Sequence, residues 1–80
     1  MAERINQRRD PLIGRNLIRL REREHKKASD VLKELDLKGI HIKSGAYSKI
    51  ENGGNNPTVE MLIALTDILH CSPDDFFTRD

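Results

Sequence analysis

The sequence predicts an all-α fold, a compact bundle of five short helices. Its 80 residues are enough for one small domain and leave no room for a second. Hydrophobic residues make up 36% of the chain and only three residues are aromatic, so we expect a core of Leu, Ile and Val. Apolar residues recur at helical spacing, and capping residues, prolines and glycines separate the segments.

Residues 1–9 contain three arginines and one isolated isoleucine, which is typical of a flexible basic arm that follows a phosphate backbone once DNA is present. Asp10 and Pro11 then supply an N-cap and the proline of a first helical turn. Apolar residues follow at i, i+4 and i+7, namely Ile13, Leu17 and Leu20. The first helix is therefore expected over residues 11–24, with Arg19 and Arg23 on a solvated face.

A second helix is predicted over residues 27–36. Its apolar positions repeat at i, i+3, i+4 and i+7, namely Ala28, Val31, Leu32 and Leu35. Residues 36–43 then contain a glycine and have no second strand to pair with, so we expect a loop. Leu37, Ile40 or Ile42 would hold that loop to the core.

The segment from Ser44 to Gly53 predicts a third helix with two different faces. Ser44 is a suitable N-cap, and Gly53 suits the left-handed position after the last turn. One face is apolar and carries Ala46, Tyr47 and Ile50. The other face is polar and carries Ser44, Gly45, Ser48, Lys49 and Asn52. Small polar side chains and a single cation fit a narrow polar space such as a DNA groove.

Two further helices complete the domain. Thr58 is expected to cap a helix over 59–69, whose apolar residues cover the wide arc of a central helix: Val59, Leu62, Ile63, Leu65, Ile68 and Leu69. Ser72 and Pro73 begin a short helix over 73–77. We therefore expect a basic arm at 1–9, a domain at 10–77 and a tail at 78–80.

Positive charge is concentrated in the N-terminal part. Residues 1–49 hold 13 of the 14 Lys and Arg and 7 of the 13 acidic residues, a balance of +6, whereas residues 50–80 have a balance of −5. One end should be electropositive, as a nucleic-acid partner requires; the alternative is an accidental gradient on a solvated surface.

Other classes of site lack support in the sequence. The single cysteine, Cys71, forms no intrachain disulfide and favours a reducing cytoplasmic setting. Neither Cys71 nor the three histidines have the spacing of a zinc site, and a lone Cys beside His70 does not supply a nucleophile with its base. No run approaches the roughly 20 apolar residues of a membrane helix. We expect no enzyme activity, metal or cofactor.

Three blocks of sequence resemble the helix-turn-helix family of phage repressors and Cro proteins, also called the Xre family. They are Ile13-Gly14, Leu17 and Leu20-Arg21-Glu22; Tyr47-Ser48-Lys49-Ile50-Glu51-Asn52-Gly53; and Pro57-Thr58, Leu62, Leu65, Leu69 and Ser72-Pro73-Asp74-Asp75-Phe76-Phe77. The resemblance covers about residues 12–77. It implies that the third helix lies in the major groove of DNA while the second lies across the backbone.

The resemblance also implies roles for single residues. The base-facing positions are Ser44, Gly45, Ser48 and Lys49. The positions that contact the DNA backbone are Lys27, Ser29, Lys43, Asn52, Asn55 and Asn56. Arg21 and Glu51 are expected to form a structural ion pair that joins the first and third helices. Phe76 and Phe77 are expected at a two-fold dimer contact, with one ring directed inward and one at the interface.

The chain departs from the family pattern in three places. The connection between the second and third helices is about five residues longer than usual. Lys27 and Ala28 replace the usual Ser or Thr and Gln, and His25 and His70 stand where glycine is frequent. We predict a homodimeric, sequence-specific, double-stranded DNA-binding transcriptional regulator. The alternative is a protein-interaction module, such as an antitoxin or adaptor, built on the same fold.

Overall fold

Four α-helices and one 3-10 helix form the part of the chain that the computed structural model describes, residues 11–79. The helices are α1 (Leu12–Arg23), α2 (Ala28–Leu37), α3 (Ser44–Glu51) and α4 (Val59–Ile68), followed by the 3-10 helix η1 (Pro73–Phe76). Residues 11–79 contain no strand, which confirms the all-α prediction. The arm at residues 1–9 and its neighbour Asp10 lie outside the described residues.

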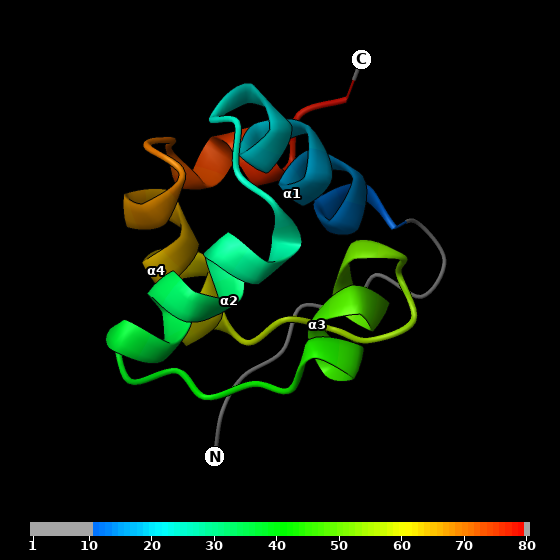
Figure 1. Ribbon diagram of the computed structural model, residues 1–80. Coiled ribbons are helices and arrows are strands. Elements are labelled where there is room, and N and C mark those ends of the chain that lie inside the picture. Colours follow the sequence, from blue (N-terminus) through cyan, green and yellow to red (C-terminus); the bar gives the residue numbers. More distant parts are fainter. Residues whose placement is uncertain (1–10, 80) are drawn as a thin grey trace.

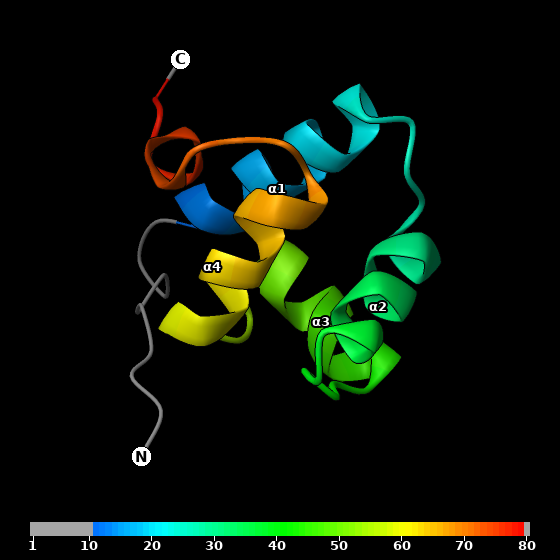
Figure 2. The ribbon, with the colours of Figure 1, turned by 90° about the vertical axis from the view of Figure 1, so that its left-hand side faces the viewer.

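The packing order is visible in Figures 1 and 2. Helix α1 packs against α3 and η1, and α2 packs against α3 and α4 (Figure 1). In the view of Figure 2, α4 lies in front of α1, while α2 lies to the lower right. The fifth helix was predicted over 73–77 but is a single 3-10 turn that ends at Phe76. Its start matches the prediction, because the Ser72 N–H donates to Asp75 Oδ2 (2.9 Å).

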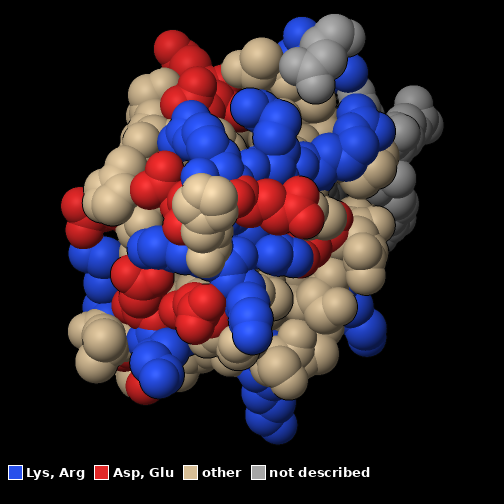
Figure 3. Space-filling view, turned by 45° about the horizontal axis from the view of Figure 1, so that its top comes forward, with Lys and Arg blue, Asp and Glu red and all other residues tan. Residues whose placement is uncertain are grey.

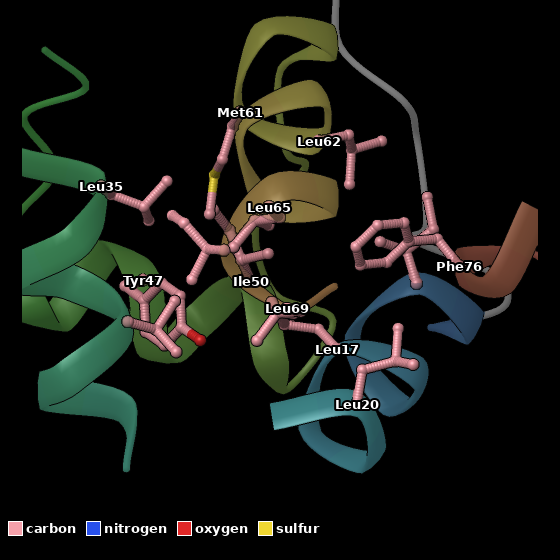
Figure 4. Close-up of a cluster of buried hydrophobic side chains, with 13 residues drawn as sticks. Leu17, Leu20, Leu35, Tyr47, Ile50, Met61, Leu62, Leu65, Leu69 and Phe76 are labelled. Atoms are coloured by element: carbon pink, nitrogen blue, oxygen red, sulfur yellow. The ribbon is translucent and has the colours of Figure 1, made fainter. Parts of the chain in front are cut away.

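The core is aliphatic with two aromatic rings (Figure 4). Its largest fully buried side chains include Leu17, Leu20, Leu35, Leu65, Leu69, Tyr47 and Phe76. The predicted arc on α4 was too wide, since Ile63 is 64% exposed. Helix α4 packs against α2 and η1, and its residues Glu60 and Ile63 remain exposed to solvent.

Each of the four α-helices is followed by a residue in the left-handed region. Gly39 and Gly53 have φ +85°, as suits glycine, but His25 (φ 57°) and His70 (φ 52°) adopt the same conformation. After α3, the Gly53 N–H donates to the Ile50 carbonyl (3.2 Å). These geometries confirm Gly53 as the end of the third helix.

Three predicted helix starts were wrong by one residue, since α2 also begins at Ala28 and not at residue 27. Pro11 is the N-cap of α1 rather than its first residue, and Lys43 rather than Ser44 is the N-cap of α3. Each of these boundaries differs from the prediction by one residue, a difference that capping preferences alone do not resolve. The Thr58 cap was right, because its Oγ1 accepts a hydrogen bond from the Met61 N–H (3.1 Å).

The long connection after α2 is held to the core by its isoleucines. Ile40 and Ile42 are half-buried against the core, whereas Leu37 is the last residue of α2 and is 81% exposed. The Ile40 N–H also donates to the Leu35 carbonyl (2.9 Å), which closes the end of α2. The connection therefore reaches α3 along the surface of the core.

Helices α1 and α3 approach closely at Gly14. A Cβ added there would lie 2.5 Å from the backbone carbonyl oxygens of both Ile50 and Glu51. Such a contact is too short for any side chain, so glycine is required for this crossing. The close approach places the last turn of α3 directly on α1.

Candidate nucleic-acid interface

The outer face of α3 is small, polar and exposed. Ser44, Gly45, Ser48 and Lys49 all lie on it, while Tyr47 and Ile50 on the opposite face are buried in the core. The structure thus brings the four predicted base-facing residues together on one surface. A Cβ added at Gly45 would meet no atom within 4 Å, so this surface is open at the first turn of the helix.

An ion pair fixes α3 to α1 behind this face. Arg21 Nε lies 2.7 Å from Glu51 Oε2, and Arg21 Nη2 donates to Glu51 Oε1 (3.1 Å). The side chains are 17% and 9% exposed, so the pair is largely shielded from water. The hydrogen bond that Arg21 donates to the Glu51 carboxylate raises the pKa of Arg21 above its ordinary value. This is the pair that the resemblance implied.

Tyr47 adds a buried hydroxyl that the sequence did not indicate. Its side chain is 1% exposed, and among the described residues its Oη has no hydrogen-bond partner. Burial raises the pKa of Tyr47, and the nearby Glu51 carboxylate raises it further, so the phenol stays neutral. The only sign of this buried hydroxyl in the sequence was a polar group at an otherwise apolar position of the helix.

Two cations lie at the starts of α2 and α3. Lys27 is the N-cap of α2 and Lys43 is the N-cap of α3, and both are exposed, as is Ser29 in the first turn of α2. The backbone N–H of Lys27 donates to Asp30 Oδ2 (2.8 Å). The N-terminal ends of both helices carry the positive end of the helix dipole, which suits phosphate oxygens.

The sequence that forms these helices matches the model of one known family. The sequence model of the helix-turn-helix family matches residues 17–76. The chain belongs to this family, with phage repressor and Cro-like proteins. A search of curated proteins and a search of solved structures each found no match. The family match makes this a helix-turn-helix domain of the type found in DNA-binding regulators.

Within this helix-turn-helix domain, the three asparagines after α3 are not equivalent. Asn52 is exposed, as a phosphate contact requires, whereas Asn55 and Asn56 are half-buried. The side-chain amide of Asn55 donates to the Ala46 carbonyl (3.4 Å), and the backbone N–H of Asn55 donates to the Lys49 carbonyl (3.2 Å). Asn55 therefore holds its loop against α3, and the contacts of Asn52, Asn55 and Asn56 with the DNA backbone stay predictions.

The C-terminal end of the domain corrects one predicted site. Phe76 is fully buried among core residues, so it is not available to a dimer interface, while Phe77 is 49% exposed. The reason is Asn16 on α1, a buried residue that the sequence analysis missed. Its Nδ2 donates to the carbonyl oxygens of Phe76 (2.8 Å) and Thr78 (3.0 Å). The signal in the sequence that could have predicted this role was an asparagine on the apolar side of the first helix.

Arg19 and Arg23 are exposed, as expected, and both also make hydrogen bonds within the domain. Arg19 Nη2 donates to Asn16 Oδ1 (3.1 Å), and Arg23 Nη2 donates to the Leu69 carbonyl (3.1 Å) at the end of α4. Arg19 Nη2 also donates to the Asp75 carbonyl (3.5 Å), so both residues fasten α1 to the C-terminal half of this helix-turn-helix protein.

Metal-binding clusters and membrane-spanning helices are absent from the described residues. Residues 11–79 hold no group of three or more His, Cys, Asp or Glu that could bind a metal ion. None of the helices in this range combines the length and apolarity needed to cross a membrane.

Proposed function

We propose that this protein is a cytoplasmic, sequence-specific regulator of transcription that inserts α3 into the major groove of double-stranded DNA. The observation that carries the proposal is the open polar face of α3, held at a fixed angle by the Arg21–Glu51 pair. A helix presents such a face to base edges without reorganising its side chains, because its opposite face is fixed in the core.

Base reading falls mainly to Lys49 in this proposal. Its ammonium group donates to guanine O6 and N7, whereas the hydroxyls of Ser44 and Ser48 donate or accept and discriminate weakly. Gly45 contributes no side chain, and its open surroundings let the backbone of α3 approach the DNA. The specificity of the protein would therefore depend on few direct contacts.

Contacts to the DNA backbone complete the proposed interface. Lys27, Ser29 and Lys43 at the helix starts and Asn52 at the end of α3 are exposed donors on either side of the base-facing residues. Such contacts set the register of α3 without carrying sequence information. The basic arm at residues 1–9 is proposed to add further phosphate contacts.

Selection from a random pool of double-stranded DNA tests the proposal. We expect one enriched motif, with an affinity that falls steeply as salt rises because phosphate counterions are released. Failure to enrich any sequence, together with no binding at low salt, contradicts it and favours the protein-interaction module.

Lys49→Ala then tests the role of α3. We expect relaxed preference at one base-pair position, worth about 1–3 kcal/mol, with other positions unchanged. Lys38→Ala is the control, because Lys38 is ion-paired with Asp67 at the junction of α2 and α4. Equal loss of preference in both variants would remove Lys49 from the base contacts.

A homodimer is part of the proposal, because one domain of this size contacts a single half-site. Phe77 is the proposed interface residue, since its ring is half-exposed while Phe76 is buried. Sedimentation of the wild type is expected to show a dimer that Phe77→Asp converts to a monomer with the same helical content. A monomeric wild type at high concentration would contradict the dimer.

A further inference from the structure

Lys26, in the connection between α1 and α2, binds two other helices through its ammonium group. Its Nζ donates to Glu34 Oε1 (3.0 Å) and Oε2 (2.8 Å) on α2, and to the Ile68 carbonyl (2.9 Å) at the end of α4. The side chain of Lys26 is 22% exposed, so these contacts are partly shielded from water. The last carbonyl groups of α4 form the negative end of its helix dipole, which favours a cation there.

The backbone of Lys26 is bound to the ion pair behind α3. Its N–H donates to the Arg21 carbonyl (2.9 Å), and its own carbonyl accepts a hydrogen bond from Arg21 Nη1 (3.2 Å). Arg21 Nε and Nη2 donate to the Glu51 carboxylate. A continuous set of hydrogen bonds therefore begins at Glu51 in α3, passes through Arg21 and Lys26, and ends at Glu34 in α2.

Charge alone does not distinguish Lys26 from the other cations of the chain. Lys and Arg groups interleave with Asp and Glu groups across the middle of the face shown in Figure 3. Lys33 carries the same charge on the exposed side of α2. The distinguishing feature of Lys26 is its set of contacts, which joins α2, α4 and the Arg21–Glu51 pair.

We propose that Lys26 is a positioning residue of the DNA interface, which holds the start of α2 at a fixed place relative to α3. This role rests on the function proposed above. Lys27, the N-cap of α2 and a proposed phosphate contact, follows Lys26 directly in the chain. Lys26 acts without touching DNA, because its ammonium group is directed to α2 and α4. Holding Lys27 and the exposed face of α3 in one geometry lets both bind DNA without reorganisation.

Affinity for the DNA motif selected by the wild type is the first measurement. Lys26→Met and Glu34→Met are each expected to weaken binding about tenfold, because each removes one side of the contact that fixes α2. Glu34→Met also removes a negative charge, so an effect of charge alone would tighten binding to DNA. The two explanations therefore predict changes of opposite sign for Glu34→Met.

Two further variants complete the comparison. Lys26→Arg keeps a charged donor for the same acceptors and should restore most of the affinity lost in Lys26→Met. Lys33→Met is the control for the loss of one positive charge from α2 and should bind nearly as the wild type does. Tighter or unchanged binding by Glu34→Met overturns the proposal and, if Lys26→Met is weakened, assigns Lys26 to a direct phosphate contact. A loss in Lys33→Met equal to that in Lys26→Met also overturns it.

The angle between α2 and α3 in the free protein is the second measurement, taken from residual dipolar couplings of the backbone amides without DNA. Unfolding curves first set a temperature at which every variant is folded. The angle should change in Lys26→Met and Glu34→Met and keep its wild-type value in Lys26→Arg and Lys33→Met. An unchanged angle in the first two variants overturns the positioning role. A changed angle, together with a wild type that binds no DNA, supports that role and contradicts only the proposed function.

Discussion

Arg21 donates two hydrogen bonds to the carboxylate of Glu51, thirty residues away in sequence, and thereby joins α1 to the last turn of α3. A third bond from Arg21 Nη1 to the Lys26 carbonyl (3.2 Å) ties the same guanidinium to the chain that enters α2. One side chain therefore sets the relative positions of three helices. The orientation of the exposed face of α3 depends on this contact and on the close approach at Gly14.

Removing either partner of this pair is expected to be costly. Arg21→Met and Glu51→Gln should each lower the free energy of unfolding by about 3 kcal/mol, because a shielded charge is left without its partner. The double variant should lose less free energy of unfolding than the sum of the two single losses. Thermal and urea unfolding of all four proteins completes the cycle. Simple additivity would show that the two residues do not interact in solution.

Tyr47→Phe is expected to leave stability unchanged or to raise it by up to about 1 kcal/mol. The substitution keeps the ring in the core and removes a hydroxyl that lacks a hydrogen-bond partner among the described residues, where an unmet buried group costs about 1–3 kcal/mol. Urea unfolding measures the change, with Tyr47→Leu as a control that loses ring volume. A clear loss in Tyr47→Phe would mean that the hydroxyl is bonded, with Glu51 as the nearest acceptor candidate.

The left-handed conformation of His25 predicts a stabilising substitution. His25→Gly should raise the free energy of unfolding by about 0.5–1 kcal/mol, because relief of Cβ strain exceeds the added entropy of the unfolded chain. Gly39→Ala, at the equivalent position after α2, makes the reverse type of change and should lower the free energy of unfolding. Chemical unfolding of both variants measures these changes in the free energy of unfolding. A destabilised His25→Gly would point to a stabilising contact made by the imidazole.

Acid is expected to weaken the junction of α1 and α4. His70 Nδ1 lies 2.7 Å from Glu24 Oε1, and this hydrogen bond lowers the pKa of Glu24 below its ordinary value of 4.5. A carboxyl group with a lowered pKa stabilises the fold above its ordinary pKa and ceases to do so as pH falls through the lowered value. Melting temperatures measured from pH 6 to pH 2 should fall less steeply for Glu24→Gln than for the wild type. Parallel curves would show that Glu24 does not contribute.

The helices and their order were determined by the sequence alone, because capping residues and helical spacing act over a few neighbouring positions. Thr58 and Gly53 marked a helix start and a helix end correctly. The two faces of α3 followed from spacing too, since residues three and four apart share a side of a helix. The Arg21–Glu51 pair was available only through the resemblance to a family.

Other features were decided by the tertiary structure, because they depend on which distant segments meet. Asn16 has no partner within its own helix for its amide hydrogens, and its bonds to Phe76 and Thr78 exist only when the chain end folds back on α1. That return buries Phe76 and leaves Phe77 half-exposed. The need for glycine at position 14 likewise follows from the crossing with α3, since a helical pattern alone tolerates a side chain there. Local spacing carries no information about such contacts between segments distant in sequence.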